Sequence, residues 1–188
     1  GYIKGYPPGV RENGGQYTHG SLWVPLALAR QGKGDEAVKI LSMMNPVEHA
    51  REPVDVQRYK VEPYVVAADI YALKDRVGQG GWTWYTGSAS WMYRVWLEEI
   101  VGFRLRGDQL SLDPTLPTAW DGFTVRYRYR STPYEIIIEN PDHVNHGIVS
   151  MELDGQAVKD PTLCLEDDNA RHTVRIRLGS ILTPGKPK

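Results

Sequence analysis

The apolar residues of this 188-residue chain change their spacing near residue 102, and that change limits the folds open to it. Before that point apolar side chains recur at helical intervals, as in the stripe Leu22, Trp23, Leu26 and Ala29. After it they alternate at every second position, as in "FTVRYRYRS" at 123–131. Because one period fits helices and the other fits strands, we predict a helical region at 1–101 and a small antiparallel β-sandwich-like domain at 102–183.

Four helices in two pairs are expected in the first region. They lie in the runs "THGSLWVPLALARQ", "DEAVKILSMM", "EPYVVAADIYALKD" and "SASWMYRVWLEEIVGF". Gly32 and the Asn45-Pro46 pair supply stop signals for the first two helices, and Pro63 stands near the start of the third, where proline is tolerated. The last residues, 184–188, are predicted to be disordered.

Charge and cysteine content narrow the class of protein. The chain has 22 basic and 23 acidic residues, so electrostatics give no case for nucleic acid or an anionic membrane as partner. Cys164 is the only cysteine, which excludes an internal disulfide and a cysteine-based metal cluster. No apolar run approaches the roughly 20 residues of a membrane span. The chain begins with Gly1 rather than methionine, and we expect it to be a piece of a longer polypeptide.

Aromatic residues gather in "GGWTWYTGSASW" at 80–91, just before the fourth expected helix. Tryptophan rings there can pack in a core or present a stacking surface to a sugar. Backbone N–H groups around Gly87, with the hydroxyls of Thr86 and Ser88, can form a nest for an oxyanion. In the alternative interpretation Ser88 only caps the helix and the tryptophans are core residues.

A polar loop, "PPGVRENGGQYTHGS" at 7–21, precedes the first expected helix. It is rich in side chains that donate and accept hydrogen bonds in pairs, which suits sugar hydroxyls. These side chains are Arg11, Glu12, Asn13, Gln16 and His19. His19 stands near a helix N-terminus, where an anion is favoured. The alternative is a solvated loop before a capped helix. No second histidine lies at ligand spacing, so we predict no metal site.

Glu12 and Glu62 are candidates for the paired carboxylates of a glycosidase, although the sequence does not give their separation. Alternatively, Glu62 complements the dipole of the third expected helix.

Three motifs taken together resemble one family. "GVRENGGQYTHGS", "EPYVVAADIY" and "GGWTWYTGSASWMYRV" are similar to the C-terminal part of the inverting β-glucoside phosphorylases of glycoside hydrolase family ninety-four. Within it they resemble the cyclic β-1,2-glucan synthase branch most, over about residues 1–103. The resemblance implies an (α/α)6 toroid followed by a β-domain. Residues 1–101 would form the last helical hairpins of that toroid.

The resemblance also implies a reaction and a site. Inorganic phosphate attacks the anomeric carbon with inversion, and an aspartic acid protonates the leaving oxygen. The family's phosphate ligands map onto His19, Thr86 and Gly87, its loop glutamate maps onto Glu12 as a sugar ligand, and Arg11 and Glu62 map less directly onto the sugar subsites. We expect no cofactor, with inorganic phosphate as co-substrate. The catalytic Asp is expected upstream of Gly1, so the 188 residues contain no catalytic acid and should be inactive alone.

The expected partners are a β-linked glucan or glucooligosaccharide, inorganic phosphate and the missing N-terminal part of the same polypeptide, with no nucleic acid. The expected location is the cytoplasm, either free or as a domain of an inner-membrane protein. Two other functions stay open: an (α/α)6 hydrolase that uses water with Glu12 or Glu62 as general base, and a non-catalytic module that binds glucan. In a purely structural role the tryptophans would be core and the β-domain a lid.

Overall fold

The computed structural model of the chain describes residues 1–180, which form two compact units. The helical unit comprises Gly1–Leu28 and Glu36–Trp96, and the β-unit comprises Ala29–Asp35 and everything described from Leu97 onward. The tail at 184–188, predicted to be disordered, lies outside the described residues. The assignment of 1–101 to a toroid stays a prediction, because the described helices do not by themselves form a closed ring.

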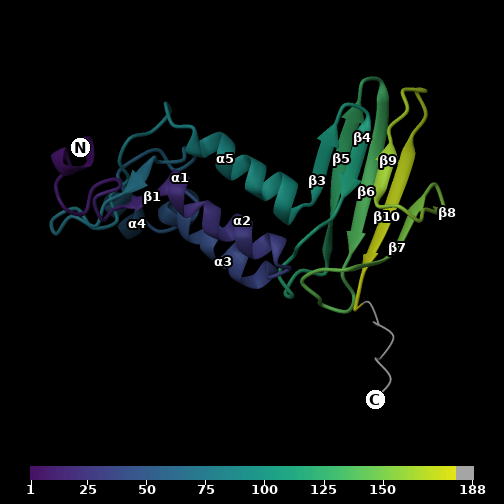
Figure 1. Cartoon of the computed structure of the whole chain (residues 1–188), viewed down its shortest axis with the longest axis horizontal. Helices are drawn as coiled ribbons and strands as arrows, with labels where there is room; N and C mark the ends of the chain where they lie inside the picture. The colour runs from purple at the N-terminus through teal and green to yellow at the C-terminus, as the bar shows by residue number, and fades with distance from the viewer. Residues whose placement is uncertain (181–188) are drawn as a thin grey trace, which may run out of the picture. The chain divides into compact units, whose positions relative to one another are not determined.

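Short helices and a two-stranded ladder make up most of the first hundred residues (Figure 1). In chain order the elements are η1 Tyr2–Gly5, β1 Gln16–Tyr17, α1 Thr18–Ser21, α2 Trp23–Arg30, α3 Gly34–Met44, η2 Glu48–Ala50, α4 Pro53–Tyr59, β2 Asp69–Ile70, α5 Ser88–Arg94 and the π-helical segment η3 Val95–Ile100. None of these helices has both the length and the apolar character of a membrane span.

Three of the four expected helices are confirmed, and the third is wrong. Helices α1 and α2, α3, and α5 with η3 occupy the runs at 18–31, 35–44 and 88–103, but residues 62–75 are not helical. Their backbone groups pair across the chain instead: the N–H of Ala68 donates to the Trp82 carbonyl at 2.7 Å, and the N–H of Thr18 donates to the Ala68 carbonyl at 2.9 Å. Tertiary pairing therefore overrides the helical spacing there.

A helix that the sequence analysis missed, α4, lies at Pro53–Tyr59. Pro53 is at its first turn, as proline prefers, and Lys60 ends it in the left-handed conformation. The Glu52-Pro53 pair, an acidic residue followed by proline, was the sequence signal for the start of this helix.

The β-unit is a sandwich of two sheets. Its strands are β3 Phe103–Arg106, β4 Gln109–Leu112, β5 Gly122–Tyr129, β6 Thr132–Glu139, β7 Ile148–Leu153, β8 Gln156–Ala157, β9 Thr162–Cys164 and β10 His172–Leu178. One sheet has the order β5-β6-β10-β7-β8 and the other β3-β4-β9. The predicted antiparallel arrangement needs one correction, because β10 lies parallel to β6, with Val174 opposite Ile136. Strand β10 inserts between β6 and β7, and it is antiparallel only to β7.

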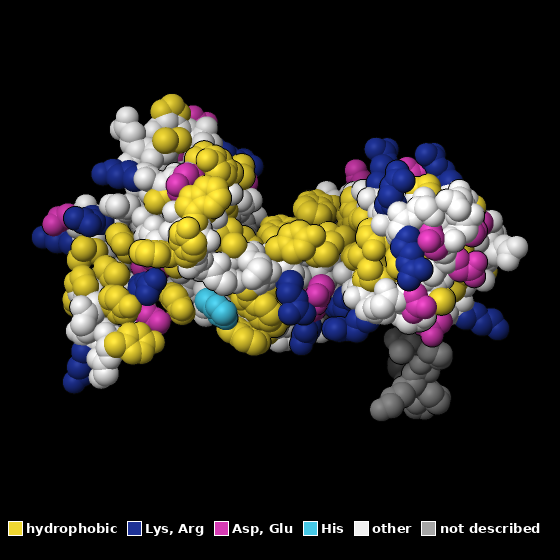
Figure 2. Space-filling model, turned by 90° about the horizontal axis from the view of Figure 1, so that it is seen from above, with side chains coloured by type: hydrophobic (Ala, Val, Ile, Leu, Met, Phe, Trp, Pro, Cys, Tyr) yellow, Lys and Arg dark blue, Asp and Glu magenta, His cyan; other side chains and the backbone are white. Residues whose placement is uncertain are grey.

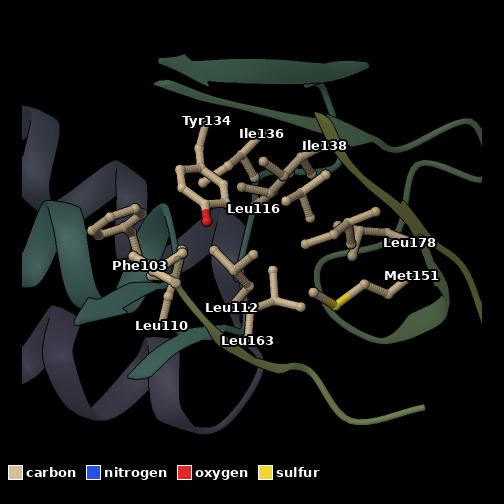
Figure 3. Packing of buried hydrophobic residues seen from close by; sticks show 13 residues of the cluster. Phe103, Leu110, Leu112, Leu116, Tyr134, Ile136, Ile138, Met151, Leu163 and Leu178 are labelled. Atoms are coloured by element: carbon tan, nitrogen blue, oxygen red, sulfur yellow. The ribbon is translucent and has the colours of Figure 1, made fainter. Parts of the chain in front are cut away.

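The core of this sandwich follows from the alternation in the sequence. Every second residue of β6 is buried, and Figure 3 shows Tyr134, Ile136 and Ile138 of that strand pointing toward Leu112 and Leu163 of the other sheet. Each fully buried aliphatic side chain contributes about 1.5–3 kcal/mol relative to exposure. The alternating pattern thus accounts for two sheets that bury their facing sides.

Candidate functional site

The polar loop at 7–15 is held against the segment around β2. Strand β1 pairs with β2 so that Tyr17 lies opposite Asp69. Upstream, the N–H of Ala72 donates to the Gly9 carbonyl at 2.8 Å. Gly9 has a φ of +94°, and a Cβ there would lie 2.4 Å from the Leu73 nitrogen. Only glycine permits so close an approach, so the loop has a fixed path.

Asp69 ties this loop to the Trp-rich stretch, and the sequence analysis gave it no role. Its side chain is only 1% exposed. One carboxylate oxygen accepts the backbone N–H of Arg11 at 2.9 Å. The other lies directly over Gly81, where a Cβ would clash with it. A buried carboxylate with these neighbours positions two motifs at once. Its place inside a run that looked helical concealed it.

Arg11 is fixed at both its backbone and its side chain. Its φ of +48° is left-handed, its guanidinium donates to the Tyr6 hydroxyl at 3.1 Å, and its Cζ lies 5.5 Å from the centre of the Tyr6 ring. The hydrogen bond to Tyr6 raises the pKa of Arg11 against the effect of burial, and the charges of Asp69 and Glu12 act in the same direction. The guanidinium therefore stays charged at every relevant pH.

Two side-chain oxygens of the polar loop, Glu12 Oε2 and Gln16 Oε1, are buried. Neither has a hydrogen-bond partner within the described residues. Leaving a buried acceptor unpaired costs about 1–3 kcal/mol. Each oxygen keeps an unused capacity to accept a hydrogen bond, but a ligand hydroxyl reaches it only after the side chain turns outward.

His19 is exposed on α1, which lies beside α5. Its ring stacks on the Trp91 ring, with centroids 6.3 Å apart and planes inclined by 21°. Trp91 also packs against Trp23 at 5.0 Å. The indole N–H of Trp91 has no hydrogen-bond partner among the described residues. The backbone N–H of Trp91 donates to the Gly87 carbonyl at 3.1 Å. The imidazole therefore contacts a residue of α5 that lies one helical turn after Gly87.

The sequence analysis predicted an oxyanion nest with the hydroxyls of both Thr86 and Ser88, but only Thr86 is not fully buried. The Thr86 hydroxyl accepts the Ser88 N–H at 3.2 Å and shares a short hydrogen bond with the Ser88 hydroxyl. Ser88 is fully buried, so its hydroxyl is not presented to a ligand. Gly87, rather than Ser88, is the N-cap residue. A Cβ added to Gly87 would meet no atom within 4 Å, so the backbone there borders open space among the described residues.

Glu62 does not lie at the start of a helix, contrary to the interpretation that it complements a helix dipole. Its Oε1 accepts the indole N–H of Trp84 at 2.9 Å. That bond is the main reason why the pKa of Glu62 is lowered. Its carboxylate is therefore ionised at neutral pH, and its tendency to take up a proton is reduced.

The tryptophans before α5 are surface residues in this structure. The exposed fraction is 62% for Trp84 and 88% for Tyr85, and Trp82 is exposed as well. Trp91 alone of the three is half-buried. The stacking-surface interpretation of "GGWTWYTGSASW" therefore fits Trp82 and Trp84, and the packing interpretation fits Trp91.

Two family models match this chain, one over the first hundred residues and one over part of the rest. Residues 1–102 match the model of the glycosyl hydrolase 94 superfamily, catalytic domain, and residues 103–156 match that of the glycosyl hydrolase family 65, C-terminal domain. Among solved structures, a family GH92 α-mannosidase from Bacteroides thetaiotaomicron aligns over 84% of this chain and 17% of its own, with 12% identity and a TM-score of 0.37. That likeness is too weak to support any conclusion.

The curated proteins similar to this chain include a glucan synthase and several phosphorylases. A cyclic beta-(1,2)-glucan synthase from Rhizobium meliloti (strain 1021) is 52% identical over 151 residues, which cover 80% of this chain and 5% of that protein. An N,N'-diacetylchitobiose phosphorylase from Vibrio furnissii is 32% identical over 160 residues, 84% of this chain and 20% of that protein. A solabiose phosphorylase from Paenibacillus borealis is 28% identical over 177 residues, 94% of this chain and 23% of that protein. The chain therefore spans less than a quarter of each relative's length, and it belongs to the glycosyl hydrolase 94 superfamily.

Proposed function

We propose that this chain is the C-terminal part of a β-glucan phosphorylase domain, in which inorganic phosphate cleaves a β-glucosidic bond with inversion and releases a sugar 1-phosphate. Family membership and the phosphorylases among its relatives support this class of reaction. The observation that supports the proposal is the stacking of His19 of α1 on Trp91 of α5, the helix that begins just after the Thr86-Gly87 corner.

Phosphate is held by three groups in this proposal. The His19 imidazole donates an N–H, the Thr86 hydroxyl donates or accepts, and the backbone at Gly87 borders the space that an oxyanion needs. Hydrogen bonds to a charged oxygen are roughly twice as strong as bonds between neutral groups. Donors that are already in place also need no reorganisation when charge moves onto the phosphate ester.

The sugar is held from the polar loop. Glu12 and Gln16 are half-buried residues of this loop, and their side chains carry oxygen acceptors that fit the hydroxyl donors of a sugar. Arg11 is rigidly placed next to Glu12 and keeps its positive charge. A loop with so fixed a path can select one orientation of the bound ring.

The proton for the leaving oxygen comes, in this proposal, from an aspartic acid elsewhere in the full-length protein. Two carboxylates close to the site are poorly suited to the task. Asp69 is covered and accepts the Arg11 backbone N–H, and Glu62 has a lowered pKa, whereas a general acid needs a raised one.

Hydrolysis by water is the second candidate, with Glu12 or Glu62 as general base. The lowered pKa of Glu62 makes it a weak base, which disfavours that role for Glu62. A glucan-binding module without catalysis is the third candidate, and the exposed rings before α5 favour it.

Phosphate dependence separates these functions. The full-length protein is incubated with β-1,2-linked glucooligosaccharides, with and without inorganic phosphate, and sugar 1-phosphate is measured. We expect product only with phosphate. Free glucose formed without phosphate would indicate hydrolysis, and binding without any product would indicate a module.

His19→Ala tests the assignment of the phosphate site. We expect the KM for phosphate to rise by about tenfold, the effect of losing one charge-assisted hydrogen bond, with little change in melting temperature because His19 is exposed. His143→Asn in the β-unit is the matched control, since His143 is also exposed and asparagine tolerates its left-handed φ of +49°. A variant that lost stability but kept its phosphate KM would show a structural role.

A further inference from the structure

Trp84 is the most unusual residue near the proposed site, because a bulky side chain is held there in a left-handed backbone conformation. We propose that Trp84 is the stacking platform for the second pyranose ring of the substrate, the ring next to the one that phosphate attacks. This inference rests on the proposed function, since it concerns the same site.

The backbone at Trp84 is strained. Its φ is +68°, a value that costs about 1–3 kcal/mol for a residue other than glycine. Such a conformation persists only when neighbouring contacts fix it. The contacts are the indole N–H, which donates to Glu62 Oε1 at 2.9 Å, and the Tyr64 ring, which meets the Trp84 ring edge-on with centroids 6.3 Å apart.

These contacts hold the indole at the surface and do not cover it. Trp84 is 62% exposed and Tyr64 is 71% exposed. A tryptophan whose N–H is satisfied and whose ring is in water presents an apolar surface beside a polar rim. Figure 2 shows hydrophobic side chains gathered over the surface of the part of the molecule that carries the N-terminus. The C–H face of a pyranose matches such a ring, and the Glu62 carboxylate at its rim has further lone pairs for a sugar hydroxyl.

The position of Trp84 relative to the phosphate site sets which ring it can take. It precedes Thr86 by two residues, which span at most about 7 Å of chain. A phosphate at the Thr86-Gly87 corner lies against the sugar that it attacks. A ring on Trp84 is then the next sugar of the same substrate, which a disaccharide contains as well as a longer chain.

Glu62 is a positioning residue in this account, because it acts through the Trp84 indole. Glu62→Gln keeps an oxygen that accepts the indole N–H, whereas Glu62→Ala removes it. We expect the glutamine variant to bind oligosaccharides nearly as the wild type does and the alanine variant to bind them weakly. If Glu62 acted only through its negative charge, Glu62→Gln and Glu62→Ala would bind oligosaccharides equally weakly.

The test is calorimetric binding of a β-1,2-linked glucodisaccharide and of longer oligosaccharides of the same linkage to the full-length protein, without phosphate. We expect Trp84→Ala to weaken the binding of the disaccharide and of the longer oligosaccharides by about tenfold, because all of them contain the second ring. Trp84→Phe keeps a stacking ring and should retain most of the affinity. Trp120→Ala in the β-unit, which removes another partly exposed tryptophan, is the matched control.

The outcomes separate this inference from the proposed reaction. Trp84-dependent binding of longer oligosaccharides supports the platform even when the protein consumes no phosphate, in which case the phosphorolysis alone is wrong. Equal affinity of wild type and Trp84→Ala for the longer chains overturns the platform, whether or not phosphate is consumed. Failure of the wild type to bind any oligosaccharide overturns it as well.

Discussion

His172 of the β-unit lies between two carboxylates. Its Nδ1 is 2.7 Å from an Asp154 oxygen, its Nε2 is 3.3 Å from an Asp168 oxygen, and its ring stacks on Tyr134. The hydrogen bond to Asp154 is the main reason why the pKa of His172 is raised, and the bond to His172 is the main reason why that of Asp154 is lowered. The charged pair therefore joins the start of β10 to the turn between β7 and β8.

A pH dependence of stability follows from these directions. Because the pKa of His172 is raised on folding, its contribution is fully present below its unfolded pKa of about 6.5 and is lost as pH rises through the folded pKa. Asp154 acts oppositely, since its contribution is lost as pH falls through a lowered pKa. Urea unfolding from acid to mildly alkaline pH should show the stability falling as pH rises above about 6.5, and His172→Gln should flatten that slope. An unchanged slope in the variant would show that His172 is not its cause.

Single residues also show what sequence alone could supply. The identities in the "RENGGQYTH" and "WYTGSAS" motifs pointed to His19, Thr86 and Gly87, and this assignment stays a prediction; the structure shows His19 stacked on Trp91 of α5. The sequence did not predict which polar residues are buried. Ser88 is fully buried, and the buried Asp69 carboxylate accepts the backbone N–H of Arg11 in the polar loop. Both facts depend on which backbone segments meet in space.

Among the elements, residues 62–75 show why helical spacing misled. A short run such as "YVVAAD" fits a helix or a buried strand, and its two valines are β-branched. Pairing with β1 and with the segment before α5 decided the outcome. Strand β10 shows the same limit, since alternation predicts a strand but does not predict that its neighbour is parallel.

The start of α3 gives a prediction at this scale. Gly34 lies so close to the segment at Leu116 that a Cβ would be 1.9 Å from the Leu116 carbonyl oxygen. The contact is with backbone, which cannot turn aside as a side chain can. We expect Gly34→Ala to lower the free energy of unfolding by about 2–3 kcal/mol, measured with urea.

Gly20→Ala in α1 is the control for that substitution. A Cβ there meets only a Tyr17 ring atom at 3.6 Å, an ordinary contact, and alanine favours a helix over glycine by about 1 kcal/mol. Its stability should stay level or rise. Equal losses from both substitutions would mean that close packing at Leu116 is not the reason.

At the scale of the whole molecule, the chain is two units that correspond to parts of much longer relatives. The groups proposed to hold phosphate and sugar lie in the helical unit, where Asp69 is covered and Glu62 has a lowered pKa, so neither is suited to act as the acid. We therefore expect the isolated 188 residues to form no sugar 1-phosphate from phosphate and β-1,2-linked glucooligosaccharides. Product above background would contradict the view that the acid is supplied from elsewhere.

The most direct test of the central claim, that His19 and the Thr86-Gly87 corner hold inorganic phosphate, is the phosphate KM of Gly87→Ala in the full-length protein. A methyl group there meets no described atom within 4 Å, and the φ of −65° suits alanine, so the melting temperature should not change. The methyl group occupies the space assigned to the anion, and we predict a rise in phosphate KM of about tenfold or more. A stable variant with an unchanged phosphate KM would contradict the account.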